Sequence, residues 1–546
     1  MIRRTPRTCP GGDAPSGSAT IDEMLPRRPV ALLVASACVL AACTSQPLPR
    51  SPSPTGAASA PAESASPEAT PTTAPTPPAK RAFPLAVVTG FTNLKAQITM
   101  AEYEAALGAD KITVPCGLDE WAAVTDGPPC LPADKIVGAV VAAPTSLALL
   151  PAGLVEPRVK VLPVDGADLF GSAEARAKPY PLMFQVTAPD QAEEWATWTA
   201  YDPGEVRTLM SVGESCPDRG VAYQAITLGK GWEYVFGGGT AAYQRVYPNP
   251  VGPGRVGDGF NIVDAVPTGN DGAVWRLIGG ADLTVQDFEC PVVDSWKVND
   301  GVVFGIDPRV LSFMKKGGTD VVTLAANHLT DQGGDGLLET IRHFDEAGIK
   351  HTGAGANLDQ ALDPAVVDVH GLRFAMVGWN IVAGVLEAGP NEPGVAWINE
   401  SNVRESIARA RRVADVVICM PQWGYPEYRT EFIPAELDMQ KLFLDAGCDQ
   451  ILGSGPHEAA EIDFTRNDVG VHFTVLGHGN FLFGQSWSQE TQEGMLPELT
   501  FRGTQLVQVR LHPYIMLNQA QASLTDPETD RHYVLQRVFD ASDVSY

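Results

Sequence analysis

The chain has 546 residues, enough for two or three domains with sizeable cores. Its formal net charge of −26 is spread along the sequence, and no basic stripe interleaved with aromatic residues is present, so nucleic-acid binding is not expected. An anionic substrate would need a local basic pocket or a metal. No apolar segment reaches the about 20 residues that span a bilayer as a helix.

The N-terminal residues predict export. A pair of arginines precedes an apolar stretch, residues 30–42, which has the length of a signal-peptide core. It ends in the tetrapeptide LAAC, which resembles the bacterial lipobox and makes Cys43 the expected lipidation site. We therefore predict a lipoprotein signal peptide over residues 1–42, with Met24 as the suspected start, and anchoring on the outer face of the cell membrane. An ordinary secretory peptide with an incidental cysteine is the alternative.

Two segments of different character follow the signal peptide. Residues 43–82 consist almost entirely of Ser, Pro, Ala, Thr and Glu, which predicts a disordered stalk that cannot bury a core. Residues 83–182 alternate strand-like runs with a helical segment and Pro/Gly breaks, which predicts a small α/β accessory module. Part of this module loosely resembles the ligand-binding lobes of periplasmic solute-binding proteins, and a purely structural role is the alternative.

Export also changes how the cysteines are interpreted, because an oxidising compartment favours disulfides. Apart from Cys9, Cys38 and the anchor Cys43, six cysteines remain, and sequence alone cannot choose among their pairings. Our prediction pairs those near each other in the chain or at the ends of predicted core strands: Cys116–Cys130, Cys216–Cys290 and Cys419–Cys448. A thiolate–metal site is the alternative, but no CxxC spacing supports it.

One stretch, residues 319–336, carries the strongest local pattern. A short apolar run breaks into Asn327, His328 and Asp331, and a glycine-rich turn then leads into an amphipathic helix that Gly348 would cap. This order predicts a buried strand followed by a crossover helix, with the Asn-His pair at the carboxyl end of the strand, where chemistry collects in open α/β sheets. A capping Asn and a satisfied core His are the structural alternative.

Polar residues that hold metals or phosphate follow apolar runs repeatedly after residue 206. Besides the Asn-His pair, these strand-end residues are Glu214, Asp287, Glu289, Gln422, Trp423, Glu427, His457, His478 and Asn480. Asp287 and Glu289 are two residues apart and so share one strand face. Helical segments at 402–414 and 435–447 lie between the runs, which predicts a layered α/β architecture.

These blocks together resemble the bacterial capsule-synthesis CapA family, also described as PgsA-type poly-γ-glutamate capsule proteins. The segment AANHLTDQGGDGLLETIRHFDEAGIKHTGAGANLDQA follows the family's Asn-Asn-His-x-x-Asp-x-Gly and Gly-x-Gly-x-Asn patterns, except that Ala326 replaces the first Asn, and the other blocks follow in the family's order over residues 206–515. The resemblance implies a layered sandwich like that of calcineurin-like metallophosphoesterases, with residues 516–546 packed on it as an extension. It also implies a role in capsule or poly-γ-glutamate-type polymer biosynthesis or export.

The resemblance further implies a pair of divalent metals held by carboxylate, Asn and His ligands, which would activate a water. The implied metal ligands in this sequence are Glu214, Asp287, Glu289, Asn327, Gln422, His457 and His478. Gln422 and Ser454 stand where the family pattern has histidines, so two imidazoles are lost. An oxygen-rich site for Mn or Mg is therefore favoured over Zn, and a site with no metal is the alternative.

Two functional hypotheses follow. In the first, the chain is a lipid-anchored, metallophosphoesterase-like hydrolase or transferase with His328 as general acid, oriented by Asp331. Its substrate, an anionic envelope polymer or a phosphoester, would be contacted by Arg219, Trp423, Glu427 and Asn480. In the second, the chain is a non-catalytic envelope scaffold or polymer-binding lipoprotein with a degenerate metal site. In either case membrane-bound capsule-synthesis proteins are the expected partners.

Overall fold

The structure is a computed structural model that describes residues 80–116, 128–187, 198–246, 263–269, 272–299, 301–486, 488–530 and 533–544. The predicted signal peptide, the lipidation site Cys43 and residues 43–79 of the predicted stalk lie outside the described residues. Residues 80–82, the end of that predicted stalk, form the start of the first strand. No helix in the described part of the chain has the length and apolar character that crossing a membrane requires.

The N-terminal module is a six-stranded sheet with strand order β3-β2-β4-β1-β5, to which β6 adds by pairing with β1. Its strands are β1 Lys80–Gly90, β2 Ile112–Pro115, β3 Cys130–Leu131, β4 Leu147–Pro151, β5 Val159–Val161 and β6 Met183–Thr187. Its helices are α1 Met100–Gly108, α3 Ala133–Ala142 and α4 Ala173–Arg176. Thr99 and Glu102 form a reciprocal capping box that fixes the start of α1.

The larger part of the chain contains two further principal sheets. The ten-stranded sheet runs β12-β11-β10-β7-β22-β23-β24-β8-β9, with β21 also paired to β7, and the six-stranded sheet runs β14-β15-β17-β18-β20-β19. Strands of the first are β7 Val206–Cys216, β8 Thr240–Val246, β9 Val263–Gly269, β10 Leu283–Phe288, β11 Val321–Thr323, β12 Lys350–Thr352, β21 Asn480–Phe483, β22 Glu493–Arg502, β23 Gln505–Leu517 and β24 Gln521–Thr525. Strands of the second are β14 Ala365–Val369, β15 Leu372–Asn380, β17 Val416–Gln422, β18 Gln450–Leu452, β19 Ile462–Arg466 and β20 Val471–Val475.

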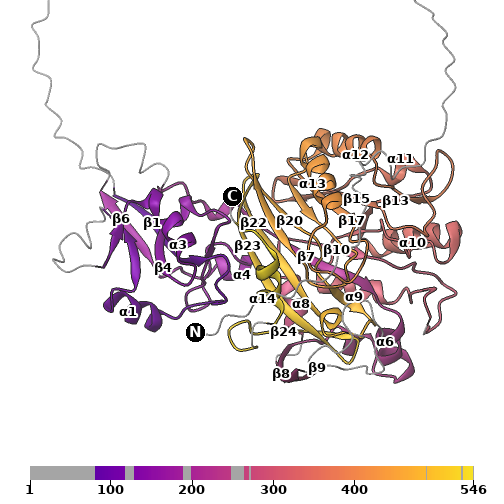
Figure 1. The fold of residues 1–546 in the computed structure, drawn as a ribbon, viewed down its shortest axis with the longest axis horizontal. Helices are drawn as coiled ribbons and strands as arrows, with labels where there is room; N and C mark the ends of the chain where they lie inside the picture. Colours follow the sequence, from indigo (N-terminus) through magenta and orange to yellow (C-terminus); the bar gives the residue numbers. More distant parts are fainter. Residues whose placement is uncertain are drawn as a thin grey trace, which may run out of the picture. The chain divides into compact units, whose positions relative to one another are not determined.

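Helices cover the outer faces of both sheets (Figure 1). They are α6 Arg219–Ala222, α7 Trp232–Val235, α8 Ala273–Ile278, α9 Val310–Gly317, α10 Gly333–Ala347, α11 Leu358–Ala361, α12 Glu400–Val413 and α13 Pro434–Ala446. Helix α14 Tyr533–Ala541 instead packs into the core between the two sheets. Gly348 ends α10 in the left-handed conformation with φ of 67°, as predicted. Asn399 begins α12 by accepting a hydrogen bond from the Asn402 N–H.

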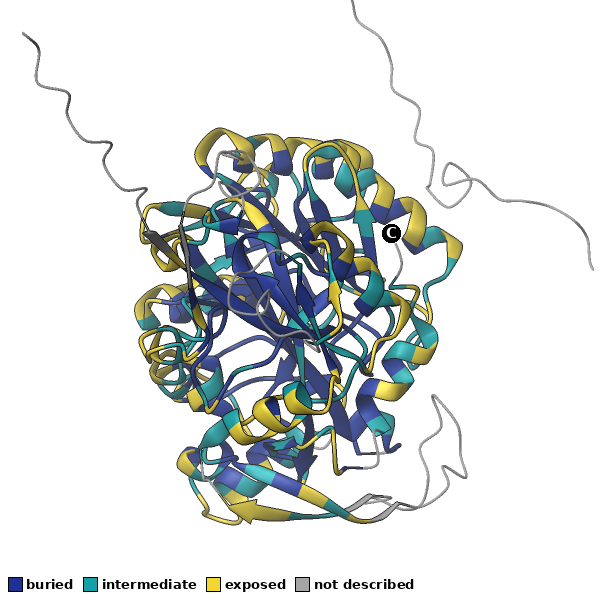
Figure 2. Ribbon diagram, turned by 90° about the vertical axis from the view of Figure 1, so that its left-hand side faces the viewer, coloured by how far each residue is buried: buried dark blue, intermediate teal, exposed yellow. Residues whose placement is uncertain are grey.

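Three apolar cores hold these layers together. Leu209, Val285, Met376 and Ile418 belong to the core that joins residues of the two sheets. Residues of α8, α9 and α10 pack on the ten-stranded sheet, and residues of α12 and α13 pack on the six-stranded sheet. In Figure 2 the strands are accordingly buried along most of their length, while the helices expose one face. The predicted layered α/β sandwich is confirmed.

The C-terminal residues extend the sandwich. The predicted extension begins at residue 516, but β23 continues to Leu517, and β24 pairs with both β23 and β8 inside the ten-stranded sheet. Helix α14 then packs against β22, β23 and β19. This segment therefore contributes a strand to the sheet in addition to the packing that was predicted.

The structure contains the three disulfides that were predicted: Cys116–Cys130, Cys216–Cys290 and Cys419–Cys448. The second joins the last residue of β7, the strand that carries Glu214, to the segment directly after β10, which carries Glu289. A cross-link at this point holds the two carboxylate-bearing strand ends together and limits the conformational freedom of the unfolded chain.

A buried ion pair joins the N-terminal module to the ten-stranded sheet. Arg510 on β23 donates to both carboxylate oxygens of Asp168 and to the carbonyl of Val161 on β5, and both charged side chains are at most a tenth exposed. A buried charge that loses its partner is strongly destabilising.

We therefore expect Asp168→Asn to lower the free energy of unfolding by about 3 kcal/mol, because Arg510 would remain buried without its counter-charge. The double variant Asp168→Asn/Arg510→Met should regain much of this loss, measured by urea unfolding. As a control, Asp445→Asn in the exposed Lys441–Asp445 pair should have an effect too small to resolve. Equal losses of unfolding free energy in Asp168→Asn and Asp445→Asn would contradict the assignment of Asp168 and Arg510 as a stabilising buried ion pair.

Candidate metal centre

The candidate site is formed where strands of both sheets end. Glu214 lies near the end of β7, Asp287 and Glu289 lie at the end of β10, and His457 follows β18 of the other sheet. The carboxyl ends of parallel strands meet at one edge, which brings residues distant in sequence together. The register of β10 on β7 shifts between Gln286 and Phe288, a local irregularity next to Asp287 of the kind found beside active sites.

Three of the predicted metal ligands converge. Ligand atoms of Glu214, Glu289 and His457 all lie within 4.8 Å of one another, and all three side chains are buried. Among the described residues, Glu289 Oε2 has no hydrogen-bond partner, neither oxygen of the neighbouring Asp287 accepts a hydrogen bond of good geometry, and Glu214 Oε2 faces only Nδ1 of His457. Buried polar atoms are normally satisfied, so these incompletely satisfied oxygens mark a place that fits a divalent cation.

The electrostatics of these carboxylates agree with that fit. Burial, together with the charges of Glu214 and Glu289, raises the pKa of Asp287 well above its usual range. Burial also raises the pKa of Glu289 to about 7, with His457 acting against it and Glu214 adding to it. Clustered carboxylates repel one another unless a cation lies between them.

Glu214 and His457 form the charged pair at the centre of this group. Burial raises the pKa of Glu214, but His457 and the N–H groups of Gly455 and His457 offset this and hold it below its ordinary value. Burial lowers the pKa of His457, and Glu214 more than reverses this, raising it to about 10. The Nδ1 of His457 lies 2.7 Å from Glu214 Oε2.

Asn480 orients His457. Its amide nitrogen donates to Gln485 Oε1 and to the carbonyl of Thr491, so its Oδ1 faces His457 Nδ1 at 3.0 Å as an acceptor. In the neutral imidazole this places the proton on Nδ1 and leaves the Nε2 lone pair for a cation. Asn480 is fully buried, so the prediction that it contacts substrate is corrected to a positioning role.

Gln422 lies beside this group and contacts two predicted ligands. Its Oε1 accepts from the Asn327 N–H at 2.7 Å, while its Nε2 donates to Asn327 Oδ1 at 2.9 Å and to Glu289 Oε1 at 3.3 Å. Gln422 and Asn327 therefore stand next to the carboxylates, as predicted, but are held by each other.

His328 and Asp331 form the predicted dyad at the edge of the site. His328 Nδ1 lies 3.0 Å from Asp331 Oδ2, which also accepts from the Phe304 N–H at 2.8 Å. Burial lowers the pKa of His328, but the hydrogen bond to Asp331 and the charge of Glu289 raise it above its ordinary value. A half-buried histidine held in this way is suited to donate a proton to a leaving group.

Arg219 and Tyr428 complete the surroundings. The Arg219 guanidinium lies 4.6 Å from the centroid of the Phe304 ring and donates through Nε to the Gly301 carbonyl. The Tyr428 ring stacks on His457 with centroids 5.6 Å apart. Glu427 next to it is half-buried, and its charge acts on Glu289 and His457. Tyr428 was missed from sequence, although it directly follows the predicted Glu427 in the same block.

Two other predicted site residues have structural roles. His478 bonds through Nδ1 to the Gly453 carbonyl and through Nε2 to Ser211 Oγ, so both ring nitrogens are occupied and it is not available as a metal ligand. Trp423 is 1% exposed and donates to the Leu476 carbonyl, which places it in the core and not at a substrate surface. The predicted roles of His478 and Trp423 were wrong for the same reason: each side chain forms a hydrogen bond to a buried backbone carbonyl, and polar atoms near strand ends often serve this purpose.

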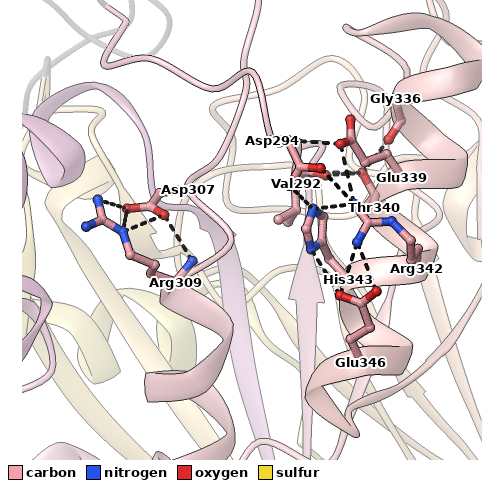
Figure 3. A network of polar contacts seen from close by, with 10 residues as sticks. All are labelled: Val292, Asp294, Asp307, Arg309, Gly336, Glu339, Thr340, Arg342, His343 and Glu346. Atoms are coloured by element: carbon pink, nitrogen blue, oxygen red, sulfur yellow. Dashed lines mark hydrogen bonds and ion pairs between the residues drawn. The ribbon is translucent and has the colours of Figure 1, made fainter.

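A second group of potential ligands, Asp294, Glu339 and His343, lies on and beside α10 (Figure 3). Here Arg342 already contacts the carboxylates of Asp294, Glu339 and Glu346, and His343 Nε2 lies 3.1 Å from Asp294. A side-chain cation supplies the counter-charge, so this network is explained as an ion-pair cluster on the helix surface.

We expect Mn²⁺ to raise the melting temperature of the metal-free chain by on the order of 5 °C, and Glu289→Gln to abolish that rise. Without metal, Glu289→Gln should itself stabilise the protein, because it removes one of the converging charges. The pKa of Glu289 is raised from 4.5 to about 7, so the stabilisation by Glu289→Gln should be absent below pH 4.5, grow as the pH rises and be complete above about pH 7. Differential scanning fluorimetry measures both effects.

The matched control is Glu339→Gln in the surface network, which should keep the full response to Mn²⁺ because Arg342 neutralises that group. If Glu339→Gln loses the response to Mn²⁺ and Glu289→Gln keeps it, the metal binds at the surface network of Asp294, Glu339 and His343, and the assignment of the buried centre is contradicted.

Asn480→Leu should weaken Mn²⁺ binding about 10- to 100-fold without abolishing it, because His457 would lose the partner that fixes its ring. Isothermal titration measures the change against His457→Ala, for which a larger loss is expected. Equal losses would make Asn480 a direct ligand, and unchanged affinity would remove its positioning role.

Comparison with known proteins agrees with the motifs. Residues 239–485 match the family model described as "Bacterial capsule synthesis protein PGA_cap". The chain is 30% identical over 249 residues to "Capsule biosynthesis protein CapA" of Bacillus anthracis and 26% identical over 228 residues to "PGA biosynthesis protein CapA" of Bacillus subtilis. These matches span 43% and 41% of this chain and 59% of each relative, so less than two thirds of the relatives' length is covered.

Solved structures with detectable similarity include a 5'-nucleotidase precursor from Thermus thermophilus, at 14% identity and a TM-score of 0.33, covering 62% of this chain and 58% of that one. The calcineurin-like phosphoesterase YfkN from Bacillus subtilis gives 12% identity and a TM-score of 0.29, covering 61% and 99%. Both scores are below the level that establishes a shared fold. The family match is a likeness over part of the chain: residues 239–485, less than half of its length, resemble the bacterial capsule synthesis protein family.

Proposed function

We propose that the chain is a metal-dependent hydrolase or transferase that acts on an anionic polymer of the poly-γ-glutamate type, or on a phosphoester, during capsule assembly or export. The observation that carries this proposal is the convergence of the buried carboxylates of Glu214, Asp287 and Glu289 around His457, with Glu289 Oε2 and both Asp287 oxygens accepting no hydrogen bond of good geometry from the described residues. With three carboxylates and one imidazole, the donor set favours Mn or Mg over Zn.

A bound divalent cation would supply an activated water and stabilise negative charge on the reacting centre. The residues of this chain then have separate roles. Glu214, Glu289 and His457 hold the cation, Asn480 fixes the His457 ring, and His328 donates a proton to the leaving group while Asp331 holds its orientation.

Arg219 supplies positive charge for an anionic substrate. Its guanidinium is half-buried on Phe304, and the ring of Phe304 contacts that of His328 with centroids 4.7 Å apart. Arginine pairs well with carboxylates and phosphates because its donors form a planar fork. In a chain with net charge −26, this local cation gives an anionic polymer a point of attachment beside the metal.

The setting of this activity is part of the proposal. A lipid on Cys43 would hold the chain on the outer face of the cell membrane, with residues 44–79 as a spacer, and membrane-bound capsule-synthesis proteins would be its partners. The relatives' names support the polymer: one is a "PGA biosynthesis protein", and a Mycobacterium tuberculosis relative, 31% identical over 159 residues, is a "Probable polyglutamine synthesis accessory protein". That match covers 27% of this chain and 41% of the relative.

A non-catalytic scaffold is the second candidate. It is favoured by Gln422 and Ser454, which stand at neighbouring bridge positions where the family pattern has imidazoles. A scaffold would keep the polymer-binding surface and the fold without turnover.

The test compares the wild-type chain with His328→Asn and Glu289→Gln on poly-γ-glutamate and on a phosphodiester, with Mn²⁺ present. The wild type should shorten the polymer or cleave the ester. His328→Asn should lower kcat about 100-fold or more with its metal content intact, because only proton donation is lost. Glu289→Gln should lose both metal and activity.

Polymer binding without turnover of either substrate by the metal-loaded wild type would overturn the enzymatic proposal and establish the scaffold. Arg219→Gln separates the two properties. It should raise KM for the anionic substrate, with little change in metal content, if Arg219 contacts the substrate.

A further inference from the structure

The hydrogen bonds of Gln422 divide the candidate metal centre into two unequal halves. On one side, Oε2 of Glu289 accepts no hydrogen bond from the described residues, and Oε2 of Glu214 is paired only with Nδ1 of His457. On the other side, Glu289 Oε1 and Asn327 Oδ1 both accept a hydrogen bond from the amide nitrogen of Gln422. Unsatisfied oxygens mark where a cation is needed, and satisfied oxygens mark where it is not.

The orientation of the Gln422 amide is fixed by its chemistry. The Asn327 backbone N–H can only donate, and it lies 2.7 Å from Gln422 Oε1, so the oxygen must face it. The amide nitrogen then faces Asn327 Oδ1 at 2.9 Å and Glu289 Oε1 at 3.3 Å. Turning the amide to offer its oxygen to a metal would break all three bonds and bury a donor against the Asn327 N–H.

Gln422 is held firmly in this position. It is 2% exposed, it ends β17, and its backbone forms a bridge with Ser454 and accepts from the Ile381 N–H. The two amide hydrogens carry partial positive charge and point at the same oxygens that a second ion would use. The side chain therefore takes the place of that ion.

We propose that this centre binds a single divalent cation, held by Glu214, Glu289 and His457, and that the Gln422 amide excludes a second one. The inference rests on the proposed metal-dependent function, but it concerns the number of ions and the residue that sets it. A centre of this kind has one cation to activate water, so stabilisation of the leaving group depends on His328.

The experiment is a Mn²⁺ titration of the metal-free full-length chain, with bound metal counted by elemental analysis after equilibrium dialysis. The wild type should bind about one ion per chain, and Gln422→His about two, because an imidazole lone pair replaces the amide hydrogens. Gln505→His, an exposed glutamine replaced in the same way, should remain at about one.

Electron paramagnetic resonance gives a second readout that needs no variant. A single Mn²⁺ gives the spectrum of an isolated ion, whereas two neighbouring ions in one centre would be exchange-coupled. An isolated spectrum at saturating Mn²⁺ supports the inference even if Gln422→His fails to fold.

The outcomes separate this inference from the function on which it rests. Two ions in the wild type, or a coupled spectrum, would overturn the single-ion inference and leave the metal-dependent function standing. No bound ion in the wild type would overturn both. A folded Gln422→His that still binds one ion would overturn the role assigned to Gln422.

Discussion

The candidate site depends on one electrostatic constraint: three buried carboxylates, Glu214, Asp287 and Glu289, converge on one imidazole. Burial and mutual repulsion make this arrangement costly, as the raised pKa values of Asp287 and Glu289 express. His457 balances only part of the negative charge: it pairs with Glu214 Oε2, while Glu289 Oε2 and both Asp287 oxygens accept no hydrogen bond of good geometry from the described residues. A divalent cation would resolve the conflict, and the proposed chemistry depends on it.

The sandwich makes the constraint possible by closing strand ends from two sheets against each other. The Glu214 carboxylate is on the ten-stranded sheet, yet it accepts from the backbone of the loop after β18 in the other sheet. Two glycines permit this approach. A Cβ on Gly213 would lie 2.2 Å from the Gly479 carbonyl, and Gly455 adopts a φ of +112° beside Gly424. The disulfide Cys216–Cys290 fixes the two carboxylate strands directly behind the site.

Sequence patterns predicted the participants better than their roles. Apolar runs ending in carboxylate, amide or imidazole identified Glu214, Glu289, Asn327 and His457, because strand ends are where a sheet exposes functional groups. The same pattern selected His478, whose ring satisfies a serine and a carbonyl. Local sequence cannot distinguish these cases, since both are polar residues after buried strands and only the partner atoms differ.

The sequence by itself indicated the alternation of strands and helices, the resemblance to the capsule-synthesis family and an oxygen-rich donor set, because periodicity, spacing and residue chemistry are local properties. It left the pairing of the six cysteines open. Only the tertiary structure decided which donors meet. It placed the polar strand ends on two sheets, turned Asn480 into the partner that orients His457, and directed the Gln422 amide at Glu289 and Asn327. These are contacts between residues up to 133 positions apart, and hydrogen-bond direction at that distance is set by packing.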